Sequence, residues 1–262
     1  MPRPFFKTIL PFAAIGLAAA LSGCSWTERM GSFDGVPLAE LDMTGEAPTG
    51  VALAGPDRLI VTEGAALDID VEADPEIADL LRFKIEDGVL GVGRENSDWK
   101  DRMSSSGKAI IRVTMPSLNS VEVAGSGTVE AARVQGDVAI DIAGSGKVEI
   151  AAIEAGSLNV EIAGSGTVTG AGTANSLSLE IAGSGDVDLE KLQAGSATID
   201  IAGSGDAIFA SDGEVKASIA GSGDVVVIGR ARCSVKTAGS GSLTCRPADS
   251  EADTDASETA DS

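Results

Sequence analysis

Histidine and tyrosine are absent from the 262-residue chain, and aromatic residues make up only 3% of it. Histidine is the commonest general base, so its absence excludes every site within this chain in which a histidine activates a serine or a cysteine. Carboxylate chemistry stays open, but the acidic residues recur at regular intervals and form no converging pair. We therefore expect a protein that is not an enzyme and carries no cofactor. A polysaccharide-active β-helix enzyme remains an alternative.

Positive charge is also scarce. Lysine and arginine together number 19 against 40 acidic residues, which gives a formal net charge of −21. Such a field repels nucleic acid and acidic polymers, so we expect no nucleic-acid partner. The scarcity of aromatics, with 33 glycines and 43% hydrophobic residues, favours stacked short strands over helices.

The N-terminus lacks an apolar run long enough to span a membrane. Arg3 and Lys7 precede a short apolar stretch that ends at Leu21, and Ser22-Gly23-Cys24 follows. This order of basic, apolar and small residues is typical of a secretory signal peptide, and its end on a cysteine resembles the bacterial lipobox. We expect residues 1–23 to be a lipoprotein signal peptide. An ordinary signal peptide with an incidental cysteine is the alternative.

The lipobox resemblance implies that Cys24 is lipidated, with palmitate among the acyl chains, and that it anchors the protein to a membrane. Residues 24–50 then read as a lipidated tether. The residue after the cysteine is Ser25, which by resemblance is not the aspartate that retains lipoproteins at the inner membrane. We therefore expect a lipid-anchored protein of the cell envelope, at the outer membrane, either periplasmic or surface-exposed.

Internal repetition dominates the rest of the chain. The motif Ala-Gly-Ser-Gly occurs seven times, at spacings of 19, 20, 19, 20, 18 and 18 residues. The serines of the seven copies are Ser126, Ser145, Ser165, Ser184, Ser204, Ser222 and Ser240. A near-constant period of this length predicts a solenoid, because one repeat cannot bury its apolar face alone.

Hydrophobicity alternates with a period of two on both sides of each motif, which predicts strand, tight bend, strand. An outward column of mostly acidic residues lies between two inward apolar columns. It consists of Glu122, Asp141, Glu161, Glu180, Asp200, Ser218 and Lys236. We expect a single-stranded parallel β-helix with coils of about 18–20 residues over 117–245. A β-propeller and antiparallel hairpins about each Gly-Ser-Gly are the structural rivals.

Three copies of the motif are followed by aspartate, namely Asp186, Asp206 and Asp224. This superficially echoes the calcium-binding nonapeptide β-roll, but the period here is twice as long and the other copies lack the aspartate. These residues are therefore weak metal candidates. Calcium binding is kept as an alternative function, and a solvated acidic face is the simpler interpretation.

The flanking segments differ from the repeats. Residues 51–116 read as a β-rich N-terminal cap that contains a hairpin at Asp87-Gly88 and a charged loop with Trp99. Cys233 and Cys245 lie symmetrically about the last motif, and an exported chain favours a disulfide between them. Two free buried thiols are the alternative. Residues 246–262 are acidic and lack large apolar side chains, so we expect them to be disordered.

The chain resembles the family named putative auto-transporter adhesin, head GIN domain, over roughly residues 38–246. The resemblance rests on the strand at Leu90, on the segment 113–127 that ends in the first Ala-Gly-Ser-Gly, and on the recurring corners. It implies a right-handed β-helix on an envelope protein and brings no catalytic residues. We expect a structural or adhesive module whose partner is a glycan or a protein. The sequence leaves the oligomeric state open.

Overall fold

The computed structural model describes residues 34–95 and 107–247, which are almost entirely β-strand. Its strands up to the first Ala-Gly-Ser-Gly are β1 (Gly50–Gly55), β2 (Arg58–Glu63), β3 (Asp68–Glu72), β4 (Leu81–Glu86), β5 (Val89–Arg94), β6 (Ile110–Met115) and β7 (Ser120–Gly125). The repeat strands are β8 (Thr128–Ala131), β9 (Val134–Gly144), β10 (Lys147–Gly164), β11 (Thr167–Gly183), β12 (Asp186–Gly203), β13 (Asp206–Ser211), β14 (Glu214–Gly221), β15 (Asp224–Ile228), β16 (Arg232–Gly239) and β17 (Ser242–Arg246). Short helical turns are η1 (Leu38–Glu40) and α2 (Pro75–Ala78).

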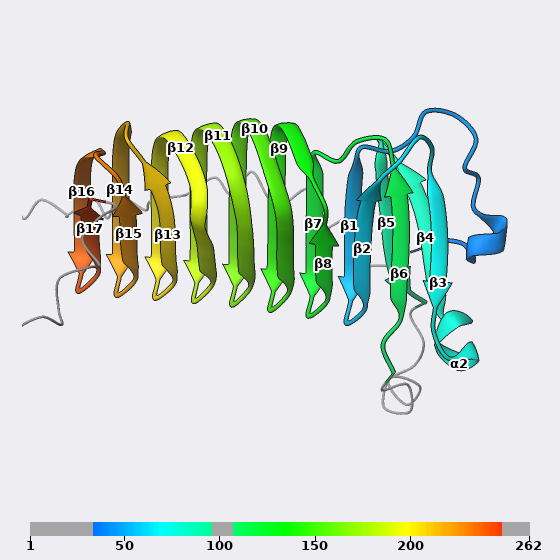
Figure 1. The fold of residues 1–262 in the computed structure, drawn as a ribbon. Helices are drawn as coiled ribbons and strands as arrows, with labels where there is room; N and C mark the ends of the chain where they lie inside the picture. The colour runs from blue at the N-terminus through cyan, green and yellow to red at the C-terminus, as the bar shows by residue number, and fades with distance from the viewer. Residues whose placement is uncertain (1–33, 96–106, 248–262) are drawn as a thin grey trace, which may run out of the picture. The chain divides into compact units, whose positions relative to one another are not determined.

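The repeats form stacked parallel coils, as predicted (Figure 1). The pairing of β10 with β11 aligns motif with motif, so that Ala163 lies beside Ala182 and Gly164 beside Gly183. Every ladder between neighbouring coils is parallel in the described repeats, which rules out both the antiparallel hairpins and the propeller. The fold is a β-solenoid.

The core lies inside the coils, where every second side chain points inward. In β10, Leu158, Val160 and Ile162 are each at most 2% exposed, whereas the residues between them face solvent. Each such aliphatic side chain contributes about 1.5–3 kcal/mol when it leaves water. Because neighbouring coils align these positions, the inward columns join into one continuous core.

One coil stacks out of chain order. Strands β1 and β2 lie between β5 and β6 on one side and β7 and β8 on the other, in parallel register with both (Figure 1). Its corner is Ala54-Gly55-Pro56-Asp57, which aligns with the first Ala-Gly-Ser-Gly. The region expected as a cap therefore contains a further coil with a degenerate motif, which the sequence analysis missed.

The connection from β6 to β7 passes over this coil. Leu118 on the connection is buried, and the amide of Asn119 donates to the carbonyl of Thr49 at 2.8 Å. The Met-Pro-Ser-Leu-Asn segment on which the family resemblance partly rests is thus the crossover that returns the chain to the growing end of the stack.

Antiparallel strands close the N-terminal end of the stack. Strand β3 pairs with β6, and β4 pairs with β5 through a hairpin in which Asp87 and Gly88 both have positive φ, as an Asp-Gly turn requires. The expected hairpin and the helical turn after Pro75 are both present. Trp99, Cys24 and the segment 248–262 lie outside the described residues. Neither of the short helical turns in the described part of the chain has the length to cross a bilayer.

The last coil carries the predicted disulfide between Cys233 and Cys245. The two cysteines occupy inward positions on β16 and β17, beside Val215 and Val227 of the preceding coil. The disulfide thus takes the place that a pair of core side chains fills elsewhere in the stack.

Candidate functional site

The seven motif serines lie in one column at the corners of successive coils, and all of them are exposed. Their backbone amides hold the corners together: Ser145 donates to the carbonyl of Gly125, and Ser165 donates to that of Gly144, each at 2.8 Å. Within residues 34–95 and 107–247, the hydroxyls of the seven serines make no hydrogen bond. They therefore form an outward row of unpaired hydroxyl groups.

The acidic column forms a ladder on the outward face that leads into the corner. Register pairs it residue by residue across β7, β9, β10, β11 and β12. Its members, here called the carboxylate ladder, are Glu122, Asp141, Glu161, Glu180 and Asp200. Neighbouring strands lie about 4.8 Å apart, so each carboxylate has another directly beside it.

Asp141 lies between Glu122 and Glu161 in the ladder. It is partly buried, and this desolvation, followed by the charges of Glu161 and Glu122 on the neighbouring coils, raises its pKa to about 6. A proton or a cation brought to this position relieves the repulsion.

Hydroxyl groups accompany the ladder on the same face. The column two residues earlier contains Asn159, Ser178 and Thr198 on β10, β11 and β12. One column further out, Ser157 donates to the carboxylate of Asp137 at 2.8 Å. The face thus presents parallel rows of carboxylate, hydroxyl and amide groups at the spacing of the coils.

The three aspartates singled out as metal candidates lie in register on the strands that follow the corner, and all are exposed. Two of them accept hydrogen bonds from the next coil. The amide of Asp224 donates to Asp206 at 2.8 Å, and both the amide and the hydroxyl of Ser242 donate to Asp224 at 3.0 and 2.7 Å. No group of three or more potential metal ligands occurs among the described residues. These carboxylates hold coils together.

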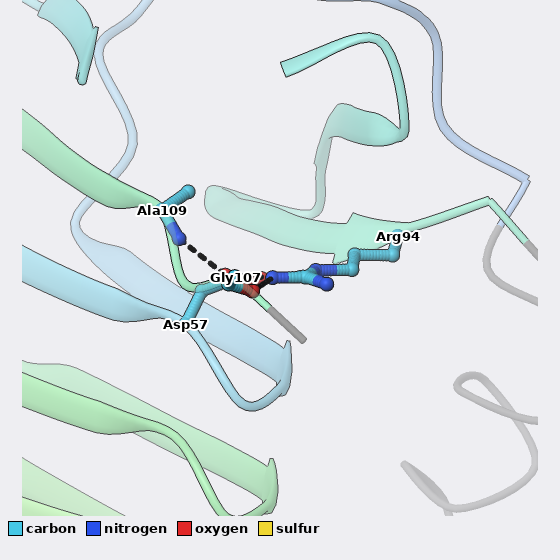
Figure 2. Close-up of polar contacts among 4 residues, drawn as sticks. All are labelled: Asp57, Arg94, Gly107 and Ala109. Atoms are coloured by element: carbon cyan, nitrogen blue, oxygen red, sulfur yellow. Dashed lines mark hydrogen bonds and ion pairs between the residues drawn. The ribbon is translucent and has the colours of Figure 1, made fainter. Parts of the chain in front are cut away.

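A buried ion pair lies at the corner of the coil formed by β1 and β2 (Figure 2). Asp57 is 1% exposed and accepts hydrogen bonds from Nε and Nη2 of Arg94, at 2.8 and 2.5 Å, and from the amide of Ala109 at 2.8 Å. Arg94 also donates to the carbonyl of Gly107 at 2.8 Å. The pair thereby joins the two ends of the excursion between β5 and β6. Sequence reasoning missed it. The alignment of Ala54-Gly55 with the motif could have revealed the corner, but not the ion pair.

A hollow of about 320 Å³ lies over the last three coils. Its lining includes Asp200, Lys216 and Lys236, together with the hydroxyls of Thr198, Ser218 and Ser234. Acid–base glycoside cleavage needs two carboxyl groups across a cleft, and Asp200 is the single carboxylate that lines this hollow. The arrangement suits the binding of a polar or charged group.

Comparison with known proteins identifies the fold and the family. A family model described as putative auto-transporter adhesin, head GIN domain, matches residues 47–231. A solved putative adhesin from Bacteroides fragilis is 21% identical with a TM-score of 0.67, and the match covers 79% of this chain and 94% of that one. A putative lipid binding protein from Parabacteroides distasonis is 22% identical with a TM-score of 0.59, covering 76% and 93%.

A putative adhesin from Parabacteroides merdae is 19% identical with a TM-score of 0.60, covering 77% of this chain and 93% of that one. At these identities the solved structures establish the solenoid fold and no more. A search of curated proteins returns no match. Because the family model spans most of the described coils, this chain belongs to the family of putative auto-transporter adhesins with a head GIN domain.

Proposed function

We propose that this protein is a non-enzymatic binding module of the cell envelope, tethered through a lipid on Cys24, and that it contacts its partner with the face that carries the carboxylate ladder. The observation behind the proposal is the regular outward face, on which carboxylate, hydroxyl and amide rows continue from coil to coil. Solenoid faces of this kind serve as extended binding surfaces. The family and its adhesin-like solved relatives support the same role.

The partner that fits this face is a cationic protein surface or a hydroxyl-rich glycan. A net charge of −21 steers cationic groups towards the protein, and a cation beside the partly buried Asp141 offsets the repulsion from Glu161 and Glu122. Serine, threonine and asparagine side chains beside the ladder supply donors and acceptors for sugar hydroxyls. The absence of histidine and the single carboxylate in the hollow support a binding role over a catalytic one.

Binding to a glycan array and to an oligolysine peptide tests the proposal. We expect binding that weakens at least fivefold in the double variant Glu161→Gln/Glu180→Gln. The matched control is Asp188→Asn/Glu190→Gln, which removes the same charge from exposed positions outside the ladder and should bind like the wild type. Wild-type protein that binds neither probe, or turnover of a glycan, would contradict the proposal.

The anchor has its own test. Cys24→Ala should move the protein from the membrane fraction to the soluble fraction and abolish labelling with palmitate, because the thiol is the site of acylation. Ser22→Ala, a neighbouring change that keeps the thiol, is the control. Palmitate labelling that persists in Cys24→Ala would refute lipidation at this residue.

A further inference from the structure

The C-terminal end of the stack differs in charge from the rest of the protein. The terminal coil, defined here as residues 229–247, contains four basic residues and no acidic one. They are Arg230, Arg232, Lys236 and Arg246. The segment that follows, residues 248–262, contains six acidic residues and no basic one. A strongly acidic protein thus places a basic coil directly before an acidic segment.

The terminal coil is also the less protected end of the solenoid. Strands β16 and β17 pair with β14 and β15 on one side, and the described residues provide no strand on the other side. Val235, an inward position in every earlier coil, is 44% exposed. Open strand edges and exposed apolar ends promote association, so solenoids need a cap. The N-terminal end has one in β3 and β4, and the terminal coil has only its disulfide.

The hollow of about 320 Å³ reaches onto this coil. Lys216 and Lys236 line it, and so does Val235, so it combines two cations with an apolar patch. Lys216 is paired with Glu214 at 3.1 Å, whereas Arg232 and Lys236 make no ion pair with any described residue. The surface therefore suits an extended chain that carries carboxylates and small apolar side chains.

We propose that residues 248–262 dock on the terminal coil and cap the solenoid. The segment alternates Asp and Glu with alanine, serine and threonine, which matches a surface of cations beside an apolar patch. It leaves the last strand at Pro247, so its effective concentration at this surface is on the order of millimolar. A second copy is a poorer occupant, because two sets of four cations would face each other. The docking is electrostatic and is compatible with a segment that has no fold of its own.

Amide hydrogen exchange tests the docking. The experiment uses residues 25–262, which contain every described strand and the segment under test. We expect the amides of β16 and β17 to exchange severalfold faster in a chain that ends at Pro247, and equally fast in a full-length variant whose six acidic residues are replaced by asparagine and glutamine. The full-length variant keeps the test valid if the shortened chain folds poorly. In 1 M NaCl the amides of β16 and β17 should exchange at the same rate in all three proteins, because salt screens the charges.

A peptide of residues 248–262 added to the shortened chain provides a second measurement. We expect saturable binding that weakens about tenfold in Arg232→Glu/Lys236→Glu, and none to the full-length protein, whose own segment occupies the surface. Exchange that is unaffected by removal or neutralisation of the segment would overturn the proposal. So would a stable dimer of the full-length protein that protects β16 and β17, because the occupant would then be a second copy.

Discussion

At the scale of single residues, the two glycines of each corner meet different requirements. The first glycine, such as Gly203, has φ of +140°, and a Cβ there would also lie under 3.0 Å from the carbonyl of the preceding coil. The second glycine, such as Gly205, lacks the positive φ but is equally crowded. Gly55, in the out-of-order coil, has φ of +128°, and a Cβ there would meet only the carboxylate of Asp57 at 3.9 Å, an ordinary contact. Backbone conformation and close approach are thus separable within one protein.

Three alanine substitutions test this separation. Gly55→Ala should lower the free energy of unfolding by about 1–2 kcal/mol, through backbone strain alone. Gly205→Ala should cost about 1–3 kcal/mol through crowding against the neighbouring coil. Gly203→Ala combines both causes and should cost the most. Urea unfolding of the three variants measures the loss of stability in each. If Gly55→Ala lost as much as Gly203→Ala, crowding against the neighbouring coil would contribute nothing.

Asp141 makes stability depend on pH in an unusual direction. Its pKa in the folded protein is raised to about 6, above the value of 3.8 for an unperturbed aspartate, so the folded state binds the proton more tightly. The effect of Asp141 on the free energy of unfolding is therefore close to zero below about pH 4. As pH rises through 6, this residue lowers the free energy of unfolding. Asp141→Asn removes the charge and should stabilise the protein at pH 7.5 by about 1–2 kcal/mol, after allowance for solvent screening.

Thermal melts of Asp141→Asn and wild type at pH 4 and pH 7.5 measure this effect. The gain in melting temperature should appear at pH 7.5 and vanish at pH 4. Glu190→Gln, an exposed carboxylate outside the ladder, is the control and should show no such difference. An equal gain at both pH values would mean that packing and not charge is responsible.

At the scale of elements, the motif and the alternation around it were sufficient to predict the repeat strands and their parallel stacking, and the positions of Cys233 and Cys245 predicted the disulfide. The coil formed by β1 and β2 was not predicted, because its corner has the sequence Gly-Pro-Asp where the repeats have Gly-Ser-Gly. Asp57 is tolerated there because its carboxylate accepts hydrogen bonds from Arg94 and from the amide of Ala109 on the neighbouring strands. That reason lies in a tertiary contact between segments far apart in the chain, which local pattern does not reveal.

Removing one partner of the ion pair between Asp57 and Arg94 should strongly lower the free energy of unfolding. Asp57→Ala leaves a mostly buried guanidinium and the amide of Ala109 without their acceptor, so we expect a loss of about 3–5 kcal/mol in urea unfolding. The double variant Asp57→Ala/Arg94→Met removes the stranded charge and should recover part of that loss. A single variant that loses less than about 1 kcal/mol would show that the pair does not hold the excursion in place.

At the scale of the whole molecule, the composition together with the near-constant repeat period was enough to predict an acidic solenoid. It did not predict that β1 and β2 would insert between later strands. Adjacent repeats with the same motif stack in chain order because each offers the next the same inward column. Residues 50–63 also have alternating inward apolar side chains. Nothing in their own sequence indicates that they pair with the strands at 89–94 and 110–115, which come much later in the chain, instead of with the next strand.

The insertion of β1 and β2 sets the order of events as the chain is synthesised from its N-terminus. These strands emerge first, yet their partners in β5, β6, β7 and β8 all follow later in the chain. Their apolar side chains therefore have no strand to pair with until β5 and β6 have emerged, and they gain their second neighbours only when residue 131 has emerged. Each coil after that point finds its neighbour already in place and adds by short-range closure. Folding is delayed at its start and then proceeds at the pace of chain delivery.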